Sequence, residues 1–176
     1  YPDIRYNISS GNAEHVLEYL DKGIIDFGLL FREIDKQKYE SIPVPIKDTW
    51  GVLMHKDSPL AIKESIQPQD LWDKPLIVPH QKGDDVFLNQ WLQRDESQLH
   101  IAATYNLIFN ASLLVDEGLG YALCYDKLIN TKDSNLCFRP LYPRLEVKGY
   151  IVWKKYQVFS KAAELFLQYL RKILEN

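Results

Sequence analysis

One segment constrains the fold more than any other, the run from Ser10 to Leu30, SGNAEHVLEYLDKGIIDFGLL. Asn12 is a natural N-cap, because its side-chain oxygen can accept from backbone N–H groups that the first helical turn leaves unpaired. Apolar residues then recur on one helical face, and Gly23 stands where a left-handed residue ends a helix. The apolar run from Ile25 to Phe31 is typical of a strand buried on both faces of a parallel sheet.

A strand is also expected before this helix. Residues Ile4–Ile8 alternate between apolar and polar side chains, which is the pattern of a strand with one buried face. The segment is therefore predicted to form a β-turn-α-β unit. Its first turn, Ser9 to Asn12, would follow the carboxyl end of a strand, where open α/β sheets bind ligands.

The same pattern returns in the second half of the chain. Ile101–Thr104 is expected as a strand, Asn106 as a possible cap, residues 107–117 as a helix ended by Gly118, and Tyr121–Tyr125 as the next strand. Two similar βαβ units predict two similar α/β lobes with a cleft between them. A single doubly wound sheet is the alternative that the sequence leaves open.

The remaining segments are assigned by the same patterns. Further strands are expected at 39–44, 50–55, 76–78, 136–138 and 147–153, with helices opened by Pro68, by Asp84 or Asp85, and by Ser160. The apolar stripe of the last helix is attributed to core packing. With crossings between the lobes at residues 80–83 and 142–145, residues 1–77 and 145–176 are predicted to form one lobe and residues 78–144 the other.

Composition restricts the class of partner. The chain has 176 residues, 46% of them hydrophobic, which is enough for a substantial core. Its 21 basic and 24 acidic residues give a formal net charge of −3, which argues against direct binding of a polyanion. No apolar run has membrane-spanning length. Cys124 and Cys137 are expected as buried free thiols in a reducing cytoplasm, with a disulfide as the less favoured alternative.

Catalytic and cofactor motifs do not emerge from the sequence. It contains no GxSxG elbow, Walker loop, HExxH or CxxC pair. Gly118-Leu119-Gly120 follows a predicted helix, whereas a dinucleotide fingerprint opens one. The four histidines lack the spacing of metal ligands on one helical face. We therefore expect no enzyme activity, no cofactor and no metal.

The polar groups that remain suit the binding of a small anion. The helix starts at Asn12 and Asn106 would present backbone N–H groups with partial positive charge, and Arg32 could donate two hydrogen bonds to a carboxylate. His80 would lie in a crossing loop beside the cleft. Each residue also has a simpler interpretation: the asparagines as plain caps, Arg32 as a solvated side chain and His80 as part of an inert loop.

Three local patterns resemble the effector-binding domain of LysR-type transcriptional regulators. The stretch from Tyr1 to Phe31 is similar to a family pattern in which Tyr-Pro-Asp precedes a strand, a turn, a helix, a glycine and a second strand, with Gly28 in place of the usual alanine. DLWDKPLIV, residues 70–78, is similar to the family's linker helix and crossover strand. LLVDEGLGYALCY, residues 113–125, resembles its Val-x-x-Gly-x-Gly helix end, with Tyr125 where proline is common.

The resemblance implies a fold, a site and partners. The fold would be α/β, with two Rossmann-like lobes joined by two crossover strands, as in type II periplasmic binding proteins. DNA would be bound only through a winged helix-turn-helix absent from this chain, and the first strand and helix of the first lobe would also precede Tyr1. A homodimer or homotetramer in the cytoplasm, away from membranes, is implied for the full-length protein. A small effector would contact residues of both lobes, namely Ser10, Gly11, Asn12, Phe31, Arg32, Pro79, His80, Gln81, Asn106, Leu107, Ile108 and Tyr125.

Three functions follow from these observations. The leading hypothesis is a ligand-sensing regulatory domain of a transcription factor. A solute-binding protein of a transport system shares the two-lobe fold and is the alternative. An enzyme of the same fold group ranks third, since no set of acid, base and nucleophile is found.

Overall fold

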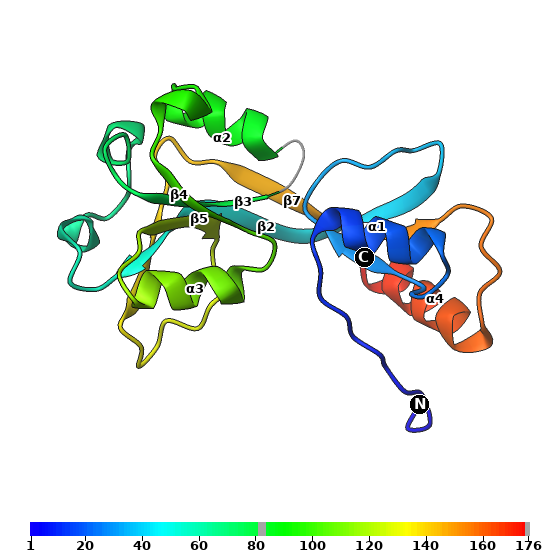
Figure 1. Ribbon diagram of the computed structural model, residues 1–176. Helices are drawn as coiled ribbons and strands as arrows, with labels where there is room; N and C mark the ends of the chain where they lie inside the picture. The colour runs from blue at the N-terminus through cyan, green and yellow to red at the C-terminus, as the bar shows by residue number, and fades with distance from the viewer. Residues whose placement is uncertain (81–83, 175–176) are drawn as a thin grey trace. The chain divides into compact units, whose positions relative to one another are not determined.

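Two strands carry the chain between its two α/β units (Figure 1). Strand β2 (Tyr39–His55) passes from the first unit to the second between Lys47 and Asp48, and β7 (Glu146–Lys154) returns between Glu146 and Val147. The structure is a computed structural model that describes residues 1–80 and 84–174, and the side chains of residues 84–87 lie outside that description. Unit 1 comprises Tyr1–Lys47 and Val147–Asn176, and unit 2 comprises Asp48–Glu146.

The unit boundaries differ from those expected. Residues 48–77 belong to unit 2, whereas the sequence placed them in the first lobe. The crossing was expected at residues 80–83, of which 81–83 lie outside the described residues. The difference arises from β2, which is one continuous strand that includes Pro43 and Pro45 rather than two strands separated by a loop. Nothing in its sequence marks the residue at which it leaves unit 1. The return lies close to the expected position.

Unit 1 is organised around helix α1 (Ala13–Asp21). As predicted, Asn12 is its N-cap, and the Asn12 side-chain oxygen accepts from the His15 N–H at 3.0 Å. Gly23, at φ +65°, ends the helix. The Gly23 N–H donates to the Leu20 carbonyl and the Ile24 N–H to the Tyr19 carbonyl, so this helix end has the two bonds of a Schellman motif.

The expected strands of unit 1 are only partly present. Residues Ile4–Ile8 form no strand, and the predicted strand Ile25–Phe31 is reduced to β1 (Gly28–Leu30). β1 pairs antiparallel with β7 and lies at the end of the sheet order, with Leu29 half exposed, so the prediction of a fully buried parallel strand is wrong. Both faces of an apolar strand are buried only when other elements pack on each side of it. The sequence of the strand alone does not show whether they do.

Helix α4 (Lys161–Leu174) completes the described part of unit 1. Ser160 opens it as expected, and its hydroxyl oxygen accepts from the Ala163 N–H at 3.2 Å. The prediction that its apolar stripe is core packing holds for only part of the stripe. Ala163 is buried and Leu167, Leu170 and Leu174 are half-buried, but Phe166 and Ile173 are exposed by 40% and 70%.

Unit 2 contains the βαβ arrangement that the sequence predicted. β4 (Ile101–Tyr105) and β5 (Tyr121–Tyr125) both pair parallel with β3 (Leu76–Pro79), and α3 (Ile108–Asp116) connects them. The second part of β2 pairs antiparallel with β5 and with β6 (Leu136–Pro140). Helix α2 (Asp84–Leu92) and short 3-10 helices at Pro59–Ile62, Pro68–Asp70 and Glu96–Gln98 complete the unit.

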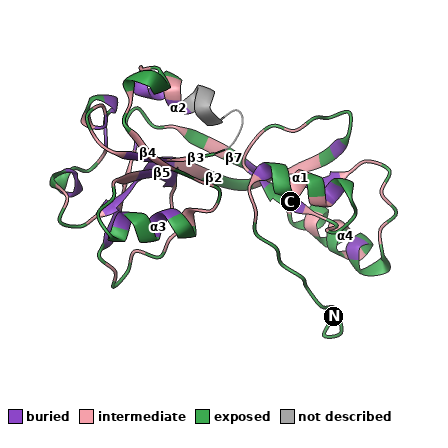
Figure 2. Ribbon diagram, viewed as in Figure 1, coloured by how far each residue is buried: buried purple, intermediate pink, exposed green. Residues whose placement is uncertain are grey.

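The core of unit 2 lies between the strands and α3. Leu53, Ile77 and Ala122 of the sheet cluster with Ala111 and Val115 of α3. Figure 2 shows in purple the buried residues that gather on these strands. Both cysteines are free and buried, as expected, and burial raises the pKa of Cys124 to about 12.

Helix α3 ends in the same way as α1. Gly118 has φ +78°, its N–H donates to the Val115 carbonyl, and the Leu119 N–H donates to the Leu114 carbonyl. The sequence echo between DKGIIDFGLL and DEGLGYALCY therefore corresponds to a repeated helix end. The flanking strands differ, because only unit 2 pairs them in parallel.

Gly118→Ala should lower the free energy of unfolding by about 1 kcal/mol, since a Cβ atom disfavours a positive φ even in open space. Gly23→Ala should cost a similar amount for the same reason. Gly118→Asn should cost less, because asparagine tolerates this conformation better. Urea unfolding measures all three, and an equal cost for alanine and asparagine at position 118 would contradict the explanation.

Candidate functional site

Three parallel strands of unit 2 end at one edge of its sheet. β3 ends at Pro79, β4 at Tyr105 and β5 at Tyr125, and the parallel register sets Pro79 opposite Tyr105. The His80 N–H donates to the Tyr105 carbonyl at 2.7 Å, which extends the pairing by one residue. The structure therefore gathers the described candidate residues of unit 2 at one sheet edge: Pro79, His80, Asn106, Leu107, Ile108 and Tyr125. Open α/β sheets bind ligands at this edge.

The start of α3 differs from the expectation for Asn106. The N-cap is Leu107, which forms no side-chain capping bond, and Asn106 is exposed. The prediction of Asn106 as the cap is therefore wrong by one residue. Because the N-cap side chain cannot accept a hydrogen bond, the first turn of α3 keeps donor capacity for another acceptor.

Two aromatic residues that the sequence analysis did not select support this edge. Trp50 of β2 is buried, and its ring meets that of Tyr125 edge-on with 4.4 Å between centroids. The Tyr105 hydroxyl donates to the Leu123 carbonyl at 2.7 Å, which ties the end of β4 to β5. Tyr105 precedes Asn106 directly and could have been chosen as a strand end, whereas the Trp50–Tyr125 contact depends on a strand register that the sequence does not show.

A carboxylate with a perturbed pKa lies near the same strand ends. Burial raises the pKa of Asp48, and the negative charge of Asp126 raises it further, against the lowering effect of the Thr49 N–H that donates to Asp48. Asp126 follows Tyr125 directly, and its N–H donates to the Thr49 carbonyl at 2.9 Å. Ionisation of Asp48 is therefore less favourable in the folded chain and costs some stability.

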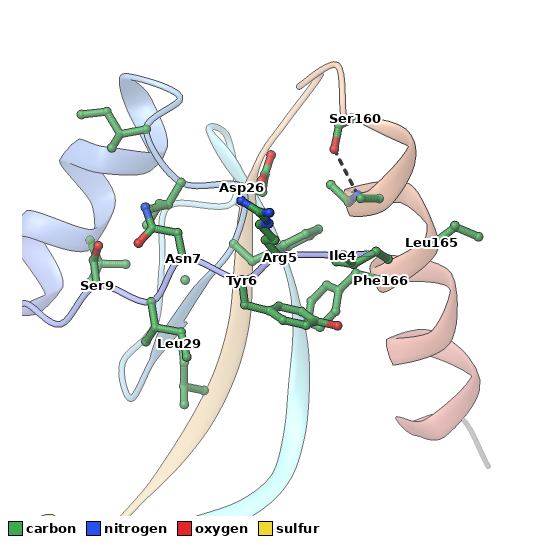
Figure 3. A pocket seen from close by; sticks show the side chains of 18 of the residues that line it. Ile4, Arg5, Tyr6, Asn7, Ser9, Asp26, Leu29, Ser160, Leu165 and Phe166 are labelled. Carbon is green, nitrogen blue, oxygen red and sulfur yellow. Dashed lines mark hydrogen bonds between the residues drawn. The ribbon is translucent and has the colours of Figure 1, made fainter. Parts of the chain in front are cut away.

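Unit 1 contains a cavity of about 850 Å³ between its N-terminal segment, β1 and α4 (Figure 3). Ser10 and Gly11, two of the candidate residues, contribute to its lining. Figure 3 shows polar side chains of Asn7, Ser9 and Asp26 on its walls together with the apolar Leu29 and Phe166. The cavity thus combines hydrogen-bonding groups with apolar surface.

The other candidate residues of unit 1 have separate environments. The side-chain oxygen of Asn12 caps α1 by accepting from the His15 N–H. Phe31 lies against β7 at Gly149, where an added Cβ would stand 3.2 Å from the Phe31 ring. Arg32 follows as a half-buried residue. Neither Phe31 nor Arg32 lines the cavity, and Gln81 lies outside the described residues.

Neither a metal centre nor a membrane span is found within residues 1–80 and 84–174. Among the described side chains, those of residues 1–80 and 88–174, no group of three or more histidine, cysteine, aspartate or glutamate residues could hold a metal ion. None of the helices in that part of the chain has both the length and the apolar character needed to cross a bilayer.

Comparison with known proteins gives one family. The sequence pattern of the family described as LysR substrate binding domain matches residues 1–175. Among curated proteins, the chain is 25% identical over 175 residues to the uncharacterized HTH-type transcriptional regulator YvbU of Bacillus subtilis, and 23% identical to YfeR of Shigella flexneri. These alignments include 98% and 97% of the chain but only 59% and 56% of the two relatives.

Solved structures share the fold. The Synechocystis CcmR regulatory domain in complex with 2-PG has a TM-score of 0.81 at 17% identity, over 100% of this chain and 86% of that one. The effector-binding domain of QuiR in complex with shikimate has a TM-score of 0.76 at 18% identity, over 94% and 79%. HinK, a LysR family regulator from Pseudomonas aeruginosa, has a TM-score of 0.77 at 20% identity, over 99% and 61%.

Asp48→Asn should raise the melting temperature at neutral pH, since it removes a charge that the folded state disfavours and keeps an oxygen to accept the Thr49 N–H. The pKa of Asp48 is higher in the folded chain than in the unfolded chain, so ionisation costs stability as pH rises through these values. The gain should vanish well below about pH 4, where both states bind the proton. Thermal unfolding across pH checks this.

The matched control for this experiment is Asp57→Asn, because the Asp57 side chain is 91% exposed. It removes the same charge from unit 2 and should leave the melting temperature nearly unchanged. A gain from Asp48→Asn that persists unchanged in acid would contradict the role of its ionisation.

Proposed function

Because the chain belongs to the LysR substrate-binding domain family, we propose that it is the ligand-sensing domain of a LysR-type DNA-binding transcription regulator. The observation that carries the proposal is the family match across residues 1–175. The two curated relatives, both named as HTH-type transcriptional regulators, favour this function over a solute-binding protein of a transport system. The whole regulator would include residues beyond this chain, which spans little more than half of either relative.

The proposed effector is a small anionic molecule that contacts candidate residues of both units. In unit 2, the support is the start of α3 at the carboxyl edge of three parallel strands, where the N-cap makes no side-chain bond. Helix N-termini favour negative charge through unpaired N–H groups and the helix dipole. Two neighbours of the same fold carry small molecules, 2-PG in the CcmR domain and shikimate in the QuiR domain.

The proposed action is a shift between two arrangements of a homodimer or homotetramer. An effector can favour one arrangement only if it binds the two with different affinity. DNA would be contacted by a part of the regulator outside this chain, in the cytoplasm. The domain itself would neither catalyse a reaction nor need a cofactor, which agrees with its membership of a regulator family.

Asn106→Leu in the longer regulator should weaken effector binding at least about tenfold, which corresponds to about 1.4 kcal/mol. The substitution puts a branched apolar side chain beside the first turn of α3 without deleting a helix cap, because the cap is Leu107. The effector would be identified by native mass spectrometry of the purified regulator and its affinity measured by calorimetry.

Asn135→Leu is the control for this variant, since Asn135 is also exposed but its side chain donates to Asp116, the last residue of α3, rather than lying before the first turn. It should leave the affinity within about twofold of the unchanged protein. If Asn106→Leu also left the affinity unchanged, the start of α3 would not be part of the effector site.

The 176-residue chain alone should bind duplex DNA only weakly, even at low salt. With a net charge of −3 it cannot supply the phosphate neutralisation that dominates non-specific affinity. A fluorescence anisotropy titration at two salt concentrations measures this. Tight binding that weakens steeply with salt would overturn the proposed division between a sensing part and a DNA-binding part.

A further inference from the structure

Two tryptophans hold the segment through which the chain leaves unit 2, residues 141–145, called here the return segment. The Trp91 indole N–H donates to the Pro143 carbonyl at 2.9 Å. The Trp50 backbone N–H donates to the Leu145 carbonyl at 2.9 Å, and the Trp50 carbonyl accepts from the Leu141 N–H at 3.0 Å. The return segment leads directly into β7, which continues into unit 1.

Both tryptophans also belong to elements next to the candidate residues of unit 2. Trp50 packs against Tyr125 at the end of β5. Trp91 lies on α2, the helix that follows β3 and its end at Pro79. It is buried, together with Leu88 and Leu92 on the same helix. The return segment is therefore attached to Trp50, which packs at the strand edge where the effector is proposed to bind, and to the helix that follows β3 along the chain.

The two attachments differ in kind. The bonds of Trp50 are backbone bonds that continue the strand pairing of β2, so they hold one register. The bond of Trp91 is a single side-chain hydrogen bond from a helix to a carbonyl in a segment without regular structure. Trp91 is a residue of α2, so a displacement of that helix carries the base of its buried side chain with it. A displacement of α2 must then either break this bond or move Pro143 with it.

We propose that Trp91 is a positioning residue that couples α2 to the return segment, so that a displacement of α2 is passed to β7. The part played by the effector as the source of that displacement rests on the proposed function. The coupling itself is a property of unit 2. One hydrogen bond joins α2 to the return segment, and that segment leads into β7 and so into unit 1.

Hydrogen exchange on the 176-residue chain tests the link without any effector. Trp91→Phe keeps a large apolar ring but deletes the N–H donor. Amides of residues 144–149 should then exchange about fivefold faster, while those of β3 and β5 stay unchanged. Tyr105→Phe is the control, because it deletes a side-chain bond to the Leu123 carbonyl elsewhere in unit 2, with no part in α2, and should not accelerate residues 144–149.

A double-mutant cycle distinguishes coupling of α2 to the return segment from a purely local stabilisation of that segment by Trp91. Leu88→Val loosens the packing of α2 and should accelerate exchange at residues 144–149 in the presence of Trp91, but much less in the Trp91→Phe background. Additive effects of the two substitutions, or an equal acceleration throughout unit 2 in Trp91→Phe, would overturn the proposal. Since no effector takes part, either result leaves the proposed function to be judged separately.

Discussion

The parallel pairing of β3 with both β4 and β5 is the constraint on which the candidate site of unit 2 depends. Parallel strands point the same way, so their carboxyl ends meet at one edge whatever the length of the connections. That arrangement places His80, Asn106 and Tyr125 together although they are far apart in the sequence. The core beneath, with Ile77 and Ala122 packed against α3, holds the edge in register.

Unit 1 lacks such parallel pairing in its described residues, since β1 pairs antiparallel with β7. β1 has three residues and lies at the end of the sheet order, beside a cavity and the half-exposed apolar face of α4. Its antiparallel partner, β7, fixes the register of Gly28 to Leu30 but leaves Ser10 and Gly11 on the cavity wall. The candidate residues of the two units are therefore held by different physical means, a parallel sheet edge in unit 2 and a capped helix start in unit 1.

Helix caps and helix ends could be predicted from the sequence, whereas the pairing of strands could not. Asn12, Gly23 and Gly118 were assigned correctly because caps and helix ends depend on a few adjacent residues. The strand at Ile4–Ile8 and the parallel strand at Ile25–Phe31 were wrong, since each depends on which distant segment lies alongside. The Trp50–Tyr125 contact escaped notice for the same reason, because antiparallel register brings the two rings together across β2 and β5.

The N-cap of α3 has a consequence for protein engineering. Leucine is among the poorest N-cap residues, and serine or aspartate at position 107 would ordinarily add about 1 kcal/mol of stability. A stabilisation programme that ranked positions by such gains would select Leu107 early. The new side chain would occupy the same backbone donors that the proposed anion needs, so the variant would gain heat resistance and lose sensitivity. A screen for melting temperature alone would therefore favour variants that bind the proposed anion less well.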